Sequence, residues 1–266
     1  ESVYMVNLDT DTVVFEKNAD ERRSPASITK IMTMALALEM CEDPANTYVT
    51  APSYIWNEFE GISISHCDIQ RGETLTMQDL LYGMALQSAN EAANIVADYL
   101  GNGSISDFVE LMNQKAQEIG AVNTHFTNPH GLADDAHYTT ARELALITAH
   151  AMKNPLFCEI CATQRAAIPN GGDGKRYLVN HNKMLFTYDG AVGVKTGFTK
   201  ATGRCLVSAA ERDGVELIAV TLCAPDDWRD HAAMLDCGFA EYECVSLAKI
   251  GEVSYSLPLL GGESDS

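Results

Sequence analysis

The chain has 266 residues, a length that fits one large domain or two modest ones and supports a sizeable core. It carries 18 Lys and Arg against 37 Asp and Glu, which gives a formal net charge of −19. A surface this acidic repels phosphate backbones and anionic lipid headgroups, which argues against nucleic-acid binding. Apolar residues make up 46% of the chain and charged residues 21%, near the globular average, which argues against wholesale disorder.

The sequence shows neither a signal segment nor a membrane span. The chain begins on Glu1, without an initiator Met or a basic-then-apolar stretch, as expected of a trimmed mature protein. The longest apolar run, 31–40, is interrupted by Thr33 and Glu39 and is typical of a buried core helix. Eight cysteines leave the redox compartment open, because they are many for a cytosolic chain and few for a disulfide scaffold.

The N-terminal part predicts a hairpin followed by a buried helix. Residues 2–8 and 13–17 flank a turn-forming segment and indicate a β-hairpin. Ser24 is then expected to cap a helix with Pro25 at its first position. The residues up to Met40 are apolar nearly all round, which predicts a helix buried on most faces. The stretch that follows, to residue 75, has only short irregular pieces.

The middle of the chain is helical. Thr76 and Asp79 open it with the spacing of a capping box, and the pattern runs to Leu100 with a break near 87–90. Further helices are predicted over 105–119 and 139–152, the second stopped by Asn154 and Pro155, with a loop over 126–139 between them.

Strands return after residue 160. The segments 205–210 and 216–223 are joined by a turn at 212–214, which predicts a hairpin, and 226–239 is helical again. Strands at both ends of a helical middle predict an α+β fold, in which N- and C-terminal segments form an antiparallel sheet flanked by helices, with an inserted helical lobe. We expect one catalytic domain over 1–243, and over 244–266 the start of a truncated C-terminal β segment or a linker.

Ser27 and Lys30 form the first candidate for chemistry. Residues three apart share a helix face, so the hydroxyl and the amine can meet. Serine needs a base to become a nucleophile, and lysine serves as one only if its pKa falls well below about 10.4. Taken alone, the pair is common, and a first-turn serine with an outward-pointing lysine is the better interpretation.

Two further motifs have similar alternatives. Ser88-Ala89-Asn90 continues to Glu91 and so also fits a capping box at a helix start. Lys195-Thr196-Gly197 at a strand end is a rarer triplet, although an edge-strand turn would explain it too.

The three motifs together, in this order and each in the expected setting, are what an acylating serine hydrolase needs. With the segments 17–33, 126–132, 137–144 and 180–199, they resemble the penicillin-binding, serine-type D-Ala-D-Ala carboxypeptidases of the low-molecular-mass class, which are similar to β-lactamases in fold. The resemblance covers roughly residues 1–240.

The resemblance implies a role for each catalytic side chain. Ser27 would be the nucleophile that forms the acyl-enzyme, and Lys30 the base that activates it. Ser88 would relay a proton to the leaving D-alanine nitrogen, with Lys195 holding that hydroxyl in its positive field.

The resemblance also implies the substrate-binding residues. Asn90 would bind the substrate amide and Thr196 the terminal carboxylate, within Lys195-Thr196-Gly197. The backbone N–H groups of Ser27 and Phe198 would form the oxyanion hole. Arg229 resembles an arginine near the carboxylate pocket, and a surface helix arginine explains it equally well.

The function expected from this resemblance is removal of the terminal D-alanine from peptidoglycan stem peptides, without metal or cofactor, outside the cytoplasm. β-Lactams would acylate the same serine. Ala89 stands where the β-lactamases carry Asp, and no acidic deacylation motif of the Glu-x-x-x-Asn kind is found, so a bound penicillin should persist. The alternatives are a β-lactamase, a transpeptidase, a non-catalytic wall-binding protein, or a zinc or redox protein built on the cysteines.

The remaining cysteines and histidines favour structural roles. Cys158 and Cys161 have metal-knuckle spacing, but no second pair follows at zinc-site distance. Cys205 and Cys223 would lie nearly opposite each other in the hairpin, so a disulfide and two free thiols are both open. For His130 and His137, packing or capping is favoured over catalysis. Because the chain is acidic and its substrate is a carboxylate, we also expect a small positive cleft around Ser27.

Overall fold

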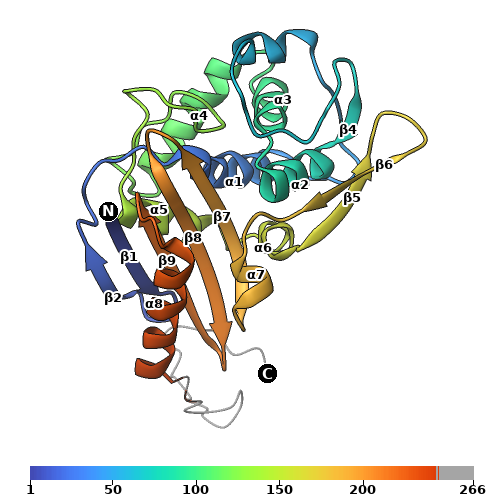
Figure 1. Ribbon diagram of the computed structural model, residues 1–266. Helices are drawn as coiled ribbons and strands as arrows, with labels where there is room; N and C mark the ends of the chain where they lie inside the picture. Colours follow the sequence, from blue (N-terminus) through green and yellow to red (C-terminus); the bar gives the residue numbers. More distant parts are fainter. Residues whose placement is uncertain (244, 246–266) are drawn as a thin grey trace, which may run out of the picture.

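A five-stranded antiparallel sheet, in the order β2-β1-β9-β8-β7, crosses the molecule. The structure is a computed structural model that describes residues 1–243 and residue 245. The predicted α+β arrangement is confirmed, because strands from the N- and C-terminal parts of the described chain pair in this one sheet (Figure 1). The strands are β1 (Ser2–Asn7), β2 (Thr12–Lys17), β7 (Ala191–Thr199), β8 (Gly203–Arg212) and β9 (Val215–Leu222).

Helices cover both faces of the sheet. Successive residues of a strand point to opposite faces, and here they enter different cores. Leu206 and Leu217 pack with Leu235 of α8 (Asp227–Glu241). The next residues along, Val207 and Ile218, belong to the larger core that the helical lobe shares. α5 (Ala141–Ala151) packs against β1 and β9, so the centre of the sheet is enclosed (Figure 1).

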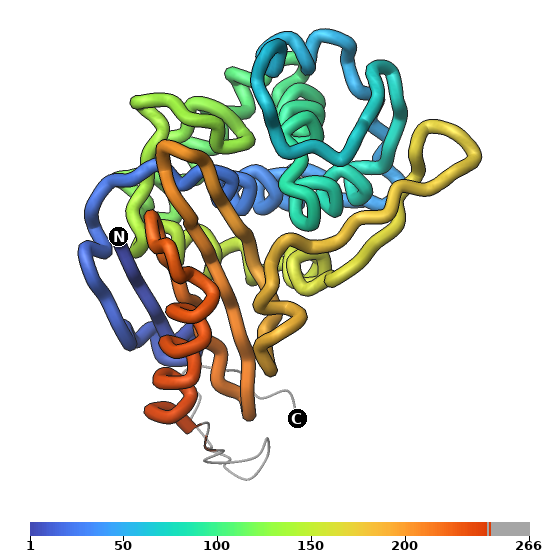
Figure 2. The backbone as a smooth tube through the Cα atoms, in the orientation of Figure 1, coloured from blue at the N-terminus to red at the C-terminus, as the bar shows by residue number. Residues whose placement is uncertain are grey.

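A buried helix lies inside the helical lobe, and the tube in Figure 2 shows it in blue behind the tip of the sheet. This helix, α1, is buried at every position from Lys30 to Leu38, as its nearly uniform apolar pattern predicts. The helices of the lobe are α1 (Lys30–Met40), α2 (Met77–Gln87), α3 (Asn90–Leu100), α4 (Ile105–Glu118) and α6 (Pro155–Ala162).

Two predicted features of the lobe are confirmed. The Thr76 hydroxyl accepts the N–H of Asp79, and the Asp79 carboxylate accepts the N–H of Thr76, which makes a complete capping box at the start of α2. The break between α2 and α3 falls at Ser88, whose left-handed backbone (φ 57°) ends one helix before the next begins.

One local prediction is wrong and one is incomplete. Ser24 does not cap a helix: its hydroxyl is buried without a partner among the described residues, and a 3₁₀ helix, η1 (Ala26–Thr29), precedes α1. Pro155 does not only stop α5, because it also opens α6, with the Asn154 side chain accepting the N–H of Leu156 at 2.9 Å.

The smaller elements extend the lobe. The segment predicted as irregular contains β3 (Tyr48–Thr50), the 3₁₀ helix η2 (Ser53–Phe59) and β4 (Thr74–Thr76). A two-stranded ribbon, β5 (Arg165–Pro169) and β6 (Lys175–Val179), projects from the body of the molecule in Figure 1, and α7 (Met184–Thr187) leads back to the sheet. No helix within the described part of the chain combines the length and apolarity of a membrane span. The segment predicted over 244–266 lies outside the described residues, apart from Val245.

Candidate active site

Lys30 occupies the centre of the site and is completely buried, so the outward-pointing interpretation is wrong. Its Nζ lies 3.0 Å from Oγ of Ser27, 2.6 Å from Oδ1 of Asn90 and 2.7 Å from the carbonyl oxygen of His130. The Ser-x-x-Lys pair meets because η1 continues directly into α1. One amine therefore joins the Ser27 motif, the Asn90 motif and the backbone of His130, a residue for which the sequence favours packing or capping.

The surroundings of Lys30 favour its neutral form. Burial lowers its pKa well below the ordinary value, and the nearby charge of Lys195 lowers it further, while Glu91 opposes the shift. Burial raises the pKa of the Glu91 carboxyl, which weakens that opposition. The physical condition set for a lysine base, a strongly depressed pKa, is therefore met by the packing of α1 and α3.

Ser88 and Asn90 stand at the break between α2 and α3. Ser88 is buried, and its Oγ has no hydrogen-bond partner among the residues that the structure describes. The capping-box interpretation is wrong, because Ala89 is the N-cap of α3 and no side chain caps it. The N–H of Asn90 donates to the carbonyl of Ser65 at 2.9 Å, which fixes the backbone where the Asn90 side chain turns toward Lys30.

Lys195 and Gly197 lie on β7, which packs against η1. Lys195 is buried, its Nζ donates to the carbonyl of Thr196 at 3.0 Å, and burial lowers its pKa to about 8. At Gly197 an added Cβ would lie 2.9 Å from the Pro25 carbonyl oxygen and 3.1 Å from Cγ1 of Ile28. The absence of a side chain therefore lets the strand approach η1 this closely.

The structure does not bring every predicted residue together. Within residues 1–243 and 245, no hydrogen bond joins Ser88 to Lys195. The Thr196 side chain is half-buried, and Phe198, two residues further along β7, is 63% exposed. Arg229 lies in the first turn of α8 with its side chain 79% exposed, and it pairs with Asp226 at 2.8 Å. In this structure Arg229 forms a surface ion pair.

The cysteines that the structure describes do not form a second centre. Cys205 and Cys223 are free thiols, which matches the alternative without a disulfide, and Cys158 and Cys161 are also free. In the part of the chain that the structure describes, no group of three or more His, Cys, Asp or Glu side chains is placed to hold a metal ion.

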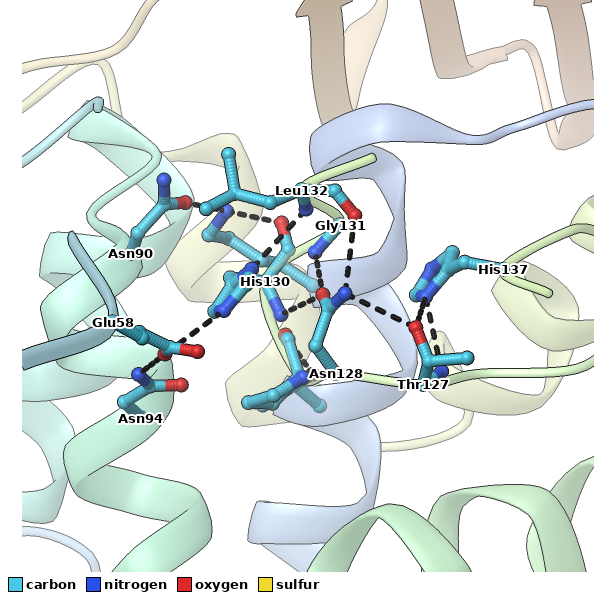
Figure 3. Close-up of polar contacts among 12 residues, drawn as sticks. Glu58, Asn90, Asn94, Thr127, Asn128, His130, Gly131, Leu132 and His137 are labelled. Carbon is cyan, nitrogen blue, oxygen red and sulfur yellow. Dashed lines mark hydrogen bonds and ion pairs between the residues drawn. The ribbon is translucent and has the colours of Figure 1, made fainter. Parts of the chain in front are cut away.

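The loop over 126–132 is the part of the site that sequence reasoning missed. Figure 3 shows the Asn128 side chain at its centre, accepting the N–H of Gly131 at 2.7 Å and donating to the carbonyl of Leu132 at 3.0 Å. The His130 carbonyl is thereby turned toward Lys30. The His130 ring lies on the other side, with Nε2 3.2 Å from Oε1 of Glu58, a carboxylate that Asn94 also contacts. The signal was an Asn-Pro-His-Gly sequence typical of a turn built on an asparagine side chain.

Comparisons with known proteins agree with this geometry. The Peptidase_S11 family model, described as D-alanyl-D-alanine carboxypeptidase, matches residues 1–226. The D-alanyl-D-alanine carboxypeptidase DacF of Bacillus subtilis (strain 168) is 34% identical over 251 residues, which cover 93% of this chain and 64% of the relative. The D-alanyl-D-alanine carboxypeptidase of Streptomyces sp. (strain K15) is 33% identical over 250 residues, covering 89% of this chain and 86% of the relative.

Solved structures show the same similarity. The crystal structure of the Streptomyces K15 DD-transpeptidase matches with a TM-score of 0.84 at 33% identity, covering 90% of this chain and 96% of that chain. The D-alanyl-D-alanine carboxypeptidase DacD from Francisella tularensis matches with a TM-score of 0.80 at 29% identity, covering 93% of this chain and 72% of that chain. The chain therefore belongs to the D-alanyl-D-alanine carboxypeptidase family of serine-type carboxypeptidases.

Proposed function

We propose that this chain removes the terminal D-alanine of peptidoglycan stem peptides through an acyl-enzyme on Ser27. The observation that carries the proposal is the position of Lys30 Nζ, 3.0 Å from Oγ of Ser27 and held by two shorter contacts to Asn90 and His130. A neutral amine has two N–H groups and one lone pair. With its N–H groups on the two nearer oxygens, the lone pair faces the Ser27 hydroxyl and can take its proton.

In the proposed reaction, Lys30 takes the Ser27 proton as Oγ bonds to the carbonyl carbon of the penultimate D-alanine. The backbone N–H groups of Ser27 and Phe198 stabilise the oxyanion, and loss of one such donor typically costs about 3 kcal/mol. The C–N bond then breaks, and the terminal D-alanine leaves with a proton relayed through Ser88. Water hydrolyses the ester and restores the Ser27 hydroxyl.

The remaining predicted residues hold the substrate. Asn90 binds the peptide amide beside the break between α2 and α3. Thr196 binds the terminal carboxylate, and the positive charge of Lys195 acts on both that carboxylate and the Ser88 hydroxyl. Gly197 lets β7 reach the site. Arg229 joins them only if its exposed guanidinium leaves Asp226, which the weakness of an exposed ion pair permits. No cofactor enters these steps.

This role sets the site of action and the partners. A peptidoglycan substrate places the protein outside the cytoplasm, where its turnover would affect cell shape, and makes it a target of β-lactams. A positive potential around Ser27 on the acidic surface stays a prediction, and it depends on the charge of Lys195, because Lys30 acts in its neutral form. Without the acidic deacylation motif, the penicillin ester should be long-lived.

Lys195 predicts how substrate binding depends on pH. Its folded pKa of about 8 means that it is charged below that pH and loses its proton above it. Because the neutral amine no longer attracts a carboxylate, KM for a D-Ala-D-Ala peptide should rise about tenfold or more between about pH 7 and about pH 10, in a KM profile measured at constant ionic strength. A KM that stays flat across this range would contradict a role of Lys195 in carboxylate binding.

Release of free D-alanine tests the proposed function directly. The wild-type protein is incubated with diacetyl-Lys-D-Ala-D-Ala, and D-alanine is quantified with and without an added amino-acid acceptor. Release by hydrolysis supports the carboxypeptidase. A product joined to the acceptor would favour a transpeptidase, the activity named for the similar Streptomyces structure. Rapid release of opened penicillin would favour a β-lactamase, and no reaction with peptide or penicillin would favour a wall-binding protein.

A further inference from the structure

The segment 126–137 packs along η1 and the start of α1. The Thr33 hydroxyl donates to the carbonyl of Pro129 at 2.6 Å, one turn after the contact of Lys30 with His130. At Gly131, any Cβ would overlap the carbonyl of Ala26. The loop thus touches the backbone immediately before Ser27.

His137, at the end of this segment, is joined to the same carbonyl through Thr29. Its Nε2 lies 2.8 Å from Oγ1 of Thr29, whose hydroxyl donates to the carbonyl of Ala26 at 2.9 Å. Threonine has a single hydroxyl proton, and Thr29 donates it to the Ala26 carbonyl. Its oxygen must therefore accept the hydrogen bond from Nε2 of His137. All three residues are buried.

The other ring nitrogen fixes this direction. Nδ1 of His137 accepts the backbone N–H of Thr127 at 3.1 Å, which leaves the ring proton on Nε2 (Figure 3). Burial lowers the pKa of His137 to about 4, with His130, His125 and Lys30 lowering it further and Asp134 opposing, so the ring is neutral at physiological pH. The chain of donors runs from His137 to Thr29 to Ala26.

Ala26 needs such a restraint because its backbone is unusual. Its φ of +50° is left-handed, a conformation that costs a residue with a Cβ about 1–2 kcal/mol. The Ala26 carbonyl and the Ser27 N–H belong to one planar trans peptide and point in opposite directions. Whatever holds the carbonyl therefore aims the N–H.

We propose that His137 is a positioning residue: through the Thr29 hydroxyl it orients the Ala26–Ser27 peptide so that the Ser27 N–H points at the substrate oxyanion. The inference rests on the proposed function, in which that N–H stabilises the tetrahedral intermediate. Since the oxyanion exists only beyond the ground state, loss of this contact slows acylation at saturating ligand and leaves the binding of the unreacted ligand unchanged.

The test measures the acylation rate constant and the dissociation constant of a fluorescent penicillin by rapid mixing. Thr29→Val keeps the shape and removes the hydroxyl, whereas Thr29→Ser keeps it. His137→Asn keeps an acceptor near Nδ1 and loses the donor, whereas His137→Gln extends a donor toward Thr29. Thr148→Val is the control, because that buried hydroxyl also donates to a carbonyl, Leu144 at 2.7 Å, inside α5.

We expect Thr29→Val and His137→Asn each to lower the acylation rate constant about tenfold or more, with the dissociation constant within about twofold of wild type. Thr29→Ser, His137→Gln and Thr148→Val should stay within about threefold of the wild-type rate. Because the two residues act in series, the double variant Thr29→Val/His137→Asn should be no slower than Thr29→Val alone.

Three results would overturn the inference while wild-type acylation stands: folded His137→Asn that acylates at the wild-type rate, a change confined to the dissociation constant, or fully additive effects in the double variant. A purely structural role would lower the melting temperature and leave the rate per folded molecule unchanged. If the wild-type protein forms no acyl-enzyme, that result would contradict the proposed function itself, and the inference about His137 would fall with it.

Discussion

Ser27→Ala is expected to abolish covalent labelling by a fluorescent penicillin and release of D-alanine. Lys30 contacts Oγ of Ser27 at 3.0 Å. Alanine has no hydroxyl at this position, so no nucleophile remains for Lys30 to deprotonate. The change removes a partly buried hydroxyl from η1 without altering its backbone, so the fold should persist. Labelling is read by in-gel fluorescence and by the mass of the intact protein, with circular dichroism to verify folding.

A matched control for this variant lies three residues earlier. The Ser24 hydroxyl is buried next to η1 and has no partner within the described residues, so Ser24→Ala removes an equivalent atom near the site. It should label like the wild type. Equal labelling of Ser27→Ala and wild type would refute Ser27 as the nucleophile, and loss of labelling in Ser24→Ala as well would indicate damage to η1.

Lys30→Met should lower the acylation rate constant by about 10²–10⁴-fold, the range typical of a lost general base. Methionine matches the length of the buried lysine stem but cannot take the Ser27 proton. It also leaves the oxygens of Asn90 and the His130 carbonyl without their donor, which adds a cost in stability of about 1–3 kcal/mol for each buried group. Rapid-mixing acylation and thermal unfolding of the same preparation separate the two effects.

Lys115→Met serves as the control for that experiment. Lys115 forms ion pairs with Glu39 and Glu118 near the surface of α4, and its loss should leave acylation unchanged. Acylation of folded Lys30→Met within about threefold of wild type would show that another group accepts the proton.

Features with local causes could be predicted from the sequence. The N-terminal hairpin, the capping box of Thr76 and Asp79, and the break at Ser88 depend on residues a few positions apart, and all are confirmed. The family prediction is confirmed as well, because three short motifs kept their order and setting. The helix stop before Pro155 is confirmed, whereas the start of α6 is not predicted, although its cause is also local: proline disrupts the interior of one helix and is equally suited to the first turn of the next.

Contacts between distant segments could not be predicted. Whether Lys30 points inward depends on Asn90 and on the His130 carbonyl, which are 60 and 100 positions away in the sequence. The contact of His137 with Thr29 spans 108 positions, and periodicity carries no information about such a pair. The sequence therefore favours packing or capping for His137, whereas its ring contacts Thr29, whose hydroxyl donates to the carbonyl before Ser27.

The three contacts of the Lys30 amine also mean that only natively folded molecules assemble the site. The groups that contact the amine come from η1, from α3 and from the loop after α4, so no single segment can build the centre alone. Closing such long loops is entropically costly and depends on the packed core. Partly folded chains should therefore lack a lysine with a lowered pKa beside Ser27. The fraction of chains that react with penicillin therefore counts natively folded molecules, which makes one labelling experiment a measure of both chemistry and folding yield.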